Sequence, residues 1–388
     1  MKRLSFIITL LAISTFALAQ IDLEWEANFG GQASDEAHSA IQTPDGGYII
    51  VGSTASEGSG KLDGYIIKVN SRGNLDWSKT YGGKKDDAFY AITKINNDYA
   101  LCGYSASKGA GKKDFWLMLI DGKGQKLWEH FYGGPKDEEA FDILRTFDNN
   151  LVLAGYTKSK GAGGRDFWII KVNPNGVGKK QGAVLWKRNV GGKGTDMATR
   201  VKQSKVDSFI YVLGHTTSYG AGGMDMYFTR LSPDRGSQRG KYFYGKSNFE
   251  HGNDFCFTDD GGYLLVGSTM SNSKGYFDAW IIKIQKEYYK VWEKSYGSSK
   301  DEELMSGFKD GDTYVLGGFT QSYGEGKSDA WILKVNAKGK VLKEQTYGEE
   351  GDDKIARMIK TSDGGYLLVG KTNSKGEGKY DVWIIKVR

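Results

Sequence analysis

Seven carboxylates recur at one position of an internal repeat, five residues after a glycine that follows an aromatic residue in six of the seven copies. This carboxylate ring comprises Asp35, Asp87, Glu138, Asp196, Glu250, Glu302 and Asp353. Carboxylate oxygens on glycine-rich loops suit calcium, so one interpretation is a cation site. The alternative is that the side chains accept hydrogen bonds from loop amides and fix the turns. A ligand site needs one copy of its residues and a scaffold needs every copy, so the recurrence favours the structural interpretation. We expect no other cofactor.

A second candidate site lies where the repeats differ. The third, fourth and fifth copies have unusual turns after their third strand-like segment, at 173–182, 232–241 and 285–290. We expect these turns on the face opposite the carboxylates, where they would form a basic and locally aromatic lip. Its residues are Lys179, Lys180, Arg235, Arg239, Lys241, Lys286, Tyr288 and Tyr289. Variable loops on a rigid scaffold often carry binding, and this charge suits an acidic glycan or a protein partner. The alternative is neutral drift of solvated turns.

Three charged residues on consecutive copies share one register, nine residues after the repeat glycine: Asp142, Arg200 and Asp254. We predict that Arg200 lies within about 4 Å of at least one of these carboxylates, near a central channel. Arg357 has the same register but is three copies away from Arg200. We therefore expect no cluster of arginines of the kind that a sialidase-like site would need.

Motifs for catalysis are scarce. The four histidines show no metal-ligand spacing, and neither a Gly-x-Ser-x-Gly elbow nor a phosphate-binding Gly-Lys-Ser/Thr loop occurs. The Gly-x-Gly loops precede strand-like segments and so lack the helix dipole that holds phosphates. One enzymatic alternative stays open, a glycan lyase or hydrolase that uses the carboxylate ring.

A repeat of about 50 residues must position all these side chains. Its copies begin near Gly30, Gly82, Gly133, Gly191, Gly245, Gly297 and Gly348. The first copy contains four strand-like segments, at 36–43, 48–52, 65–69 and 75–81, separated by glycine-rich turns. Four antiparallel strands per repeat form the blade of a β-propeller, so we predict an all-β, seven-bladed β-propeller.

The two ends of the sequence complement each other. The last copy stops after its third strand-like segment, at 382–387, and an unmatched fourth strand at 23–29 precedes the first copy. Trp25 in that strand stands where Trp77 stands in the first copy. We therefore predict one domain over residues 20–388, in which the N-terminal strand completes the last blade and leaves no unpaired edge strand.

The fullest copies of the repeat, at 30–56, 245–271 and 348–374, read Gly-Gly…Asp…Asp-Gly-Gly-Tyr followed by an apolar run and Gly-Ser-Thr-x-Ser or a close variant. This pattern resembles the repeat of secreted bacterial seven-bladed β-propeller proteins. The turn at 70–77 is similar to the Trp-docking turn of quinoprotein-like propellers, although no quinoprotein cofactor site is evident. The resemblance covers nearly the whole chain and implies the fold, because propellers have many unrelated activities.

Residues 1–19 have the pattern of a signal peptide: Lys2 and Arg3, an apolar run at 4–18, and a small-x-small cleavage pattern at 17–19. The apolar run is shorter than the ~20 residues that a membrane span needs. We expect an exported protein, periplasmic or extracellular, without a membrane span. Cys102 and Cys256 lie in apolar segments, and we expect two buried free thiols.

The net charge of +6, from 53 basic and 47 acidic residues, is too small for a dedicated nucleic-acid binder. The sequence is most consistent with an exported, non-catalytic scaffold that acts in binding or adhesion in the cell envelope. We expect a monomer whose partner is an envelope protein or an acidic glycan. The alternatives are the glycan-active enzyme and a purely structural envelope component.

Overall fold

The computed structural model describes residues 21–176 and 180–388, in which the chain forms 28 strands and no helix. The segment expected to be a signal peptide and the lip residue Lys179 lie outside these residues. No helix of the described part is long and apolar enough to cross a membrane.

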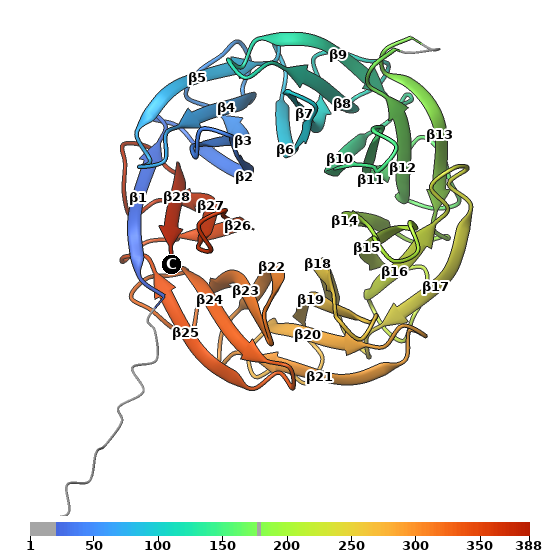
Figure 1. Ribbon diagram of the computed structural model, residues 1–388, viewed down its shortest axis with the longest axis vertical. Coiled ribbons are helices and arrows are strands. Elements are labelled where there is room, and N and C mark those ends of the chain that lie inside the picture. The colour runs from blue at the N-terminus through green and yellow to red at the C-terminus, as the bar shows by residue number, and fades with distance from the viewer. Residues whose placement is uncertain (1–20, 177–179) are drawn as a thin grey trace, which may run out of the picture.

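The strands form seven antiparallel sheets of four, arranged as blades around a ring (Figure 1). Blade 1 consists of β2 (Asp35–Gln42), β3 (Tyr48–Thr54), β4 (Asp63–Val69) and β5 (Leu75–Tyr81), and blade 2 of β6 (Asp87–Ile95), β7 (Asp98–Ser105), β8 (Asp114–Ile120) and β9 (Lys126–Tyr132). Blade 3 consists of β10 (Glu138–Arg145), β11 (Leu151–Thr157), β12 (Asp166–Asn173) and β13 (Ala183–Val190), and blade 4 of β14 (Asp196–Gln203), β15 (Ile210–Thr216), β16 (Asp225–Leu231) and β17 (Gln238–Tyr244). Blade 5 consists of β18 (Glu250–Phe257), β19 (Tyr263–Thr269), β20 (Asp278–Ile284) and β21 (Lys290–Tyr296), and blade 6 of β22 (Glu302–Asp310), β23 (Thr313–Thr320), β24 (Asp329–Asn336) and β25 (Val341–Tyr347). Blade 7 consists of β26 (Lys354–Lys360), β27 (Tyr366–Thr372), β28 (Asp381–Val387) and β1 (Leu23–Phe29).

The predicted closure of the ring is confirmed. Strand β1 pairs with β28, and the amides and carbonyls of Asp22 and Arg388 bond each other at 2.8 and 3.0 Å. Trp25 packs against the apolar cluster between blades 7 and 1. The first and last strands of the described chain therefore share one sheet, as the unmatched segment at 23–29 predicts.

Within each blade we name the strands A to D from the centre outward. Strands B and C are almost entirely buried because neighbouring blades cover both of their faces, and strand D is exposed along one side. Between blades 1 and 2, for example, Trp116 packs with Ile49 and Val51. The core is therefore divided into seven apolar clusters, each of which contains an aromatic side chain of strand C. Both cysteines are buried and free, as expected.

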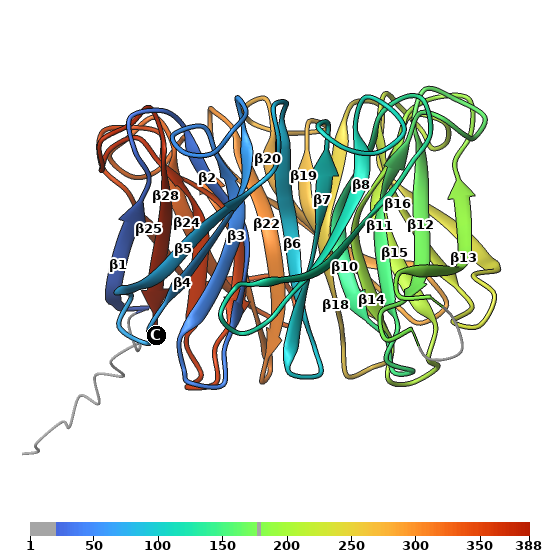
Figure 2. The same ribbon diagram turned by 90° about the horizontal axis from the view of Figure 1, so that it is seen from above.

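The ring has two distinct faces (Figure 2). The B–C loops and the connections between blades lie on one face, which we call the loop face. The A–B and C–D turns lie on the other, the turn face. The repeat glycine is required on the loop face, since a Cβ on Gly82 would lie 1.9 Å from Asp63 Oδ1.

Candidate binding site on the turn face

The carboxylate ring is buried, with each of its seven residues at most 1% exposed. Each carboxylate accepts a hydrogen bond from the backbone N–H four residues earlier in the chain. At Asp35, Oδ2 accepts from the Gly31 amide at 2.9 Å and from the Ser56 hydroxyl at 2.6 Å. These are the bonds of the turn-fixing alternative. Such burial keeps the carboxylates from a polysaccharide, which removes the observation behind the glycan-active alternative.

A second carboxylate from the preceding blade lies beside each member of the ring. At the junction of blades 2 and 3, a Cβ on Gly133 would lie 1.9 Å from Asp114 Oδ1 and 2.7 Å from Glu138 Oε2. Burial, together with the Glu138 carboxylate, raises the pKa of Asp114. No group of three or more His, Cys, Asp or Glu residues in the described ranges is placed to hold a metal ion. Calcium binding by the ring stays a prediction.

The basic lip is on the turn face only in part. Lys180, Arg235 and Lys286 are exposed on C–D turns there. Arg239 and Lys241, expected within a long turn, lie instead in β17, because the Ser232 amide bonds the Ser237 carbonyl and closes the turn earlier. Lys241 extends along the outer wall toward Tyr219 of the loop face, with Nζ 5.1 Å from the ring centroid.

A pocket lies between blades 4 and 5, which we call the tyrosine pocket. Of the lip residues, Lys286 lines it and Tyr288 packs beside it. Its volume is about 340 Å³, and Tyr211, Tyr263, Arg230, Asp207 and Lys286 are among the residues that line it. Tyr263 donates to Tyr211 Oη at 2.8 Å, and Tyr211 donates to Asp207 Oδ2 at 2.7 Å. Arg230 Nη1 lies 3.2 Å from the same carboxylate oxygen. Burial and these hydrogen bonds raise the pKa of Tyr211, so its hydroxyl stays protonated and polar.

The tyrosine pocket is bordered by Tyr288, at a place where a large and a small residue have exchanged positions relative to other blades. In blades 1, 2, 4 and 6 a glycine of the C–D turn lies against a tryptophan in strand D of the preceding blade, as Gly73 lies against Trp25. Here Gly240 stands where a tryptophan would be, and Tyr288 stands where the glycine would be, at φ 69°. This backbone conformation costs a non-glycine residue free energy. The Tyr288 ring stacks on Tyr242 with centroids 3.7 Å apart.

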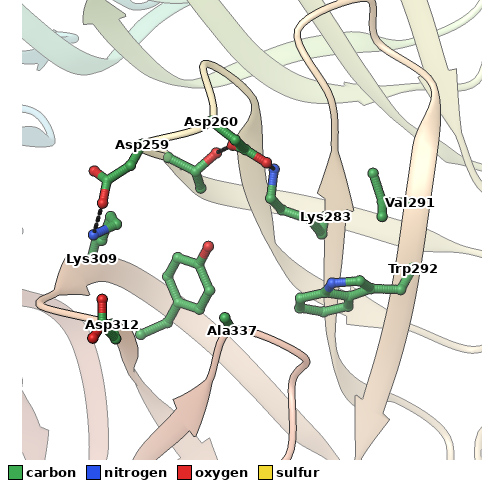
Figure 3. A pocket seen from close by; sticks show the side chains of 10 residues that line it. Asp259, Asp260, Lys283, Val291, Trp292, Lys309, Asp312 and Ala337 are labelled. Atoms are coloured by element: carbon green, nitrogen blue, oxygen red, sulfur yellow. Dashed lines mark hydrogen bonds and ion pairs between the residues drawn. The ribbon is translucent and has the colours of Figure 1, made fainter.

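A second pocket, the tryptophan pocket, lies between blades 5 and 6 and has a volume of about 420 Å³. Figure 3 shows Trp292 and Ala337 on one side and two ion pairs on the other. Lys283 pairs with Asp260 at 2.8 Å, and Lys309 pairs with Asp259 at 2.5 Å.

Thr258 lines both pockets, so the tyrosine and tryptophan pockets are neighbours on one face. Three apolar side chains are strongly exposed there: Val206 at 91%, Tyr289 at 71% and Val291 at 56%. Exposed apolar groups beside mixed charges are typical of binding surfaces. Together the two pockets and these side chains form what we call the turn-face site.

Lys286 and Tyr289 of this site were expected from the sequence, as was Tyr288, which packs beside the tyrosine pocket. Tyr211, Arg230 and Trp292 were not expected. A signal for the tyrosine pocket was present in the first turn of blade 4. That turn reads Ser204-Lys205-Val206-Asp207-Ser208-Phe209, whereas blades 1, 5 and 7 have Thr-x-Asp-Gly-Gly in this turn. The missing tryptophan at Gly240 is a second signal.

The charged trio on the inner strands is confirmed, since Arg200 lies 3.6 Å from Asp142 and 3.1 Å from Asp254. The expected separation of the arginines is wrong. Arg357 Nη1 lies 2.9 Å from the same Asp142 oxygen, so both guanidinium groups share one carboxylate. Blades three apart in the sequence meet across the ring axis, which a repeat count does not reveal.

No family model matches the chain, and no curated protein matches it. Solved structures do share its fold. A europium-containing methanol dehydrogenase has a TM-score of 0.50 at 10% identity over 91% of this chain and 85% of that chain. Sqt1 from Chaetomium thermophilum has a TM-score of 0.52 at 10% identity over 95% and 100%. A protein from Lactobacillus plantarum has a TM-score of 0.54 at 12% identity over 84% and 91%. At such identities the likeness concerns the fold alone. The seven four-stranded sheets of the described chain make it a seven-bladed β-propeller, a class with many unrelated activities, so the function must be argued from the site.

Proposed function

We propose that this protein is an exported, non-catalytic binding scaffold of the cell envelope, and that it captures an acidic glycan on the turn-face site. The observation that carries the proposal is the pair of adjoining pockets, which combine aromatic rings with cations. Sugar rings present apolar faces that pack on aromatic side chains, and their acidic groups accept charge-assisted hydrogen bonds from lysine and arginine.

Charge on the site agrees with an acidic ligand. Lys286 lines the tyrosine pocket, and Arg235 lies on the C–D turn of blade 4, outside the lining of both pockets. Their side chains are 70% and 84% accessible, and their carboxylate partners, 3.6 and 3.7 Å away on adjacent residues, are themselves at least half exposed. Such exposed pairs contribute little, so both cations are available to a ligand. Variable turns on a rigid ring suit binding by a monomer without any catalytic group.

The test is calorimetric titration with polygalacturonate as the acidic polysaccharide and dextran as the neutral one. We expect binding of polygalacturonate alone, and at least about tenfold weaker binding for the double variant Lys286→Glu/Arg235→Glu. The matched control is Lys123→Glu, an exposed lysine on the C–D turn of blade 2. Unchanged affinity in the double variant, or equal loss in the control, contradicts the site.

A protein partner in the envelope is the second candidate, and the exposed Val206, Tyr289 and Val291 favour it. Apolar side chains of this size are the usual anchors of protein interfaces. Replacing Val206 and Tyr289 by serine separates the candidates. A protein partner would be lost from an envelope pull-down, whereas binding of polygalacturonate would persist through the cations. Chain shortening of the polysaccharide in the same samples would instead identify an enzyme.

A further inference from the structure

Every innermost strand of the ring has a β-bulge at the same place. In each A–B pair the register shifts by one residue, for example between Ala37 and Ser39 in blade 1. The skipped residues are His38, Tyr90, Phe141, Thr199, Asn253, Met305 and Ala356. A bulge re-aims a side chain, and bulges are often found next to functional sites.

These seven bulge residues line one cavity of about 190 Å³ together with Arg200 and Arg357. They differ from blade to blade, although the carboxylate ring, at or just before the start of the same strands, recurs in every blade. His38, Tyr90 and Phe141 form an aromatic arc, with neighbouring ring centroids 4.9 and 5.2 Å apart. A symmetric scaffold therefore presents an asymmetric set of side chains at its axis.

The guanidinium groups of Arg200 and Arg357 are held by two buried carboxylates, Asp142 and Asp254. Asp142 is 2% exposed and accepts from the Val201 amide at 3.0 Å as well as from Arg357 at 2.9 Å. Asp254 is 3% exposed and accepts from the Gly307 amide at 3.1 Å. Both amides belong to the next blade, which fixes the carboxylates across the blade interface.

The cluster has an uncompensated positive charge. Lys202 also pairs with Asp254, at 2.7 Å, so three cations face two carboxylates in the described structure. Burial, followed by the neighbouring Arg357, lowers the pKa of Arg200, whereas against the effect of burial Asp142 and Asp254 raise the pKa of Arg357. The two like charges share Asp142 and so lie close enough to repel each other. His38 adds no charge, since burial lowers its pKa to about 4. An anion beside the arginines would relieve this repulsion.

We propose that the axial cavity binds a small organic anion. Its carboxylate would bond the guanidinium group of Arg357. The Arg357 side chain is 21% exposed, and among the described contacts its one bond to protein is made by Nη1. Its flat, apolar body would pack on the arc of Tyr90, Phe141 and His38. The volume of 190 Å³ is below the roughly 300–1,000 Å³ of pockets for drug-sized ligands, so the ligand is a small acid.

This inference is independent of the proposed function. The axial cavity and the turn-face site share no lining residue. Loss of polysaccharide binding in the variants above therefore leaves the axial site untouched, and failure of the experiment below leaves the turn-face site untouched.

The test uses the full chain after removal of its leader, titrated with benzoate, phenylacetate and 4-hydroxybenzoate. The matching neutral amides and inorganic phosphate serve as comparison ligands. We expect at least one acid to bind with a dissociation constant below about 1 mM and to raise the melting temperature. The amides and phosphate should bind at least about tenfold more weakly.

Two variants test whether the acid binds in the axial cavity. Ala356→Leu fills part of the cavity and leaves every charged residue in place, whereas Arg357→Gln removes the guanidinium group. Each should weaken binding of the acid at least about tenfold. Arg72→Gln, at an exposed turn of blade 1, is the control. The proposal is overturned if no acid binds at about 10 mM, if acids and amides bind alike, if phosphate binds as well as the acids, or if Ala356→Leu retains full affinity.

Discussion

Buried lysines beneath the A–B turns are the residues on which the turn face depends. In four blades a lysine of strand C, 2–7% exposed in its side chain, forms an ion pair with an aspartate of the turn above it. The pairs are Lys68–Asp45, Lys171–Asp148, Lys283–Asp260 and Lys386–Asp363. Each aspartate also accepts from a threonine two residues earlier. Of these four pairs, Lys283–Asp260 holds the turn that borders the two pockets.

Acid should weaken these turns, and Asp45 offers the test. The Thr43 hydroxyl and the Lys68 ammonium lower the pKa of Asp45 to about 2, against an ordinary 3.8. A depressed folded-state pKa stabilises the fold above about pH 4, and the contribution is lost as pH falls toward 2. We expect Asp45→Asn to melt below the wild type at pH 7 and the gap to close near pH 2. Thermal melts across that range measure it.

Titration of other aspartates does not affect the difference in melting temperature between the two proteins. Asp114 on the loop face has a raised pKa and acts in the opposite direction, but it is present in both proteins and cancels in the difference. A gap in melting temperature that stays constant from pH 7 to pH 2 would show that the Asp45 carboxylate contributes nothing.

Among the elements, β1 is the one that joins the two ends. It covers β28, and its Glu24 pairs with the buried Lys386 at 3.0 Å. Glu26 accepts from the Trp383 indole at 3.2 Å, and Tyr347 of blade 6 donates to the Ile21 carbonyl at 2.7 Å. Strand β1 therefore completes blade 7, and the residue Ile21 just before it is bonded to blade 6.

Deletion of residues 20–29 should lower the melting temperature by roughly 10 °C or more, because it exposes the edge of β28 and removes Trp25 from its cluster. The measurement is a thermal melt of the truncated chain. A synthetic peptide of residues 20–29 should restore part of the loss. An unchanged melt would mean that the ring does not depend on this strand.

For the whole molecule, the place in the ring where the first and last strands meet determines which contacts close the ring. The natural break lies between strands C and D of blade 7, so one sheet spans the two ends. A break between blades would leave that junction with side-chain packing alone, without strand pairing.

Two circular permutants test this, each with residues 21 and 388 joined by the same short linker. One opens in the C–D turn of blade 2, at 121–125, and the other opens between blades 1 and 2, at 83–86. We expect the first to melt close to the parent, and the second to melt at lower temperature and to aggregate more readily. Equal melting curves would refute closure through a shared blade.

Much of the architecture was predictable because the same pattern of strands and turns occurs seven times in the sequence. Strand segments 75–81 and 23–29 appear with the predicted bounds, and strands A and C begin one or two residues earlier than predicted. The Arg200 contacts followed from register alone. The extra residues at these strand starts include the carboxylates of the loop face, which accept hydrogen bonds from amides of the loops that precede them.

The candidate sites were less accessible to such reasoning. Arg357 meets Asp142 across the ring axis, and the tyrosine pocket joins turns from two blades. Neither closeness has a counterpart in sequence spacing. The first arises because the closed ring brings blades 3 and 7 together at its axis, and the second because turns of the neighbouring blades 4 and 5 converge.

The order of residues was therefore enough for the blade, the number of blades and the strand that joins the ends. These depend on short-range alternation and on turns that each repeat contains. The burial of the carboxylates, the two pockets of the turn face and the charged cavity on the axis were decided by tertiary structure. Their side chains come from separate blades, and closure of the ring brings these side chains within bonding distance.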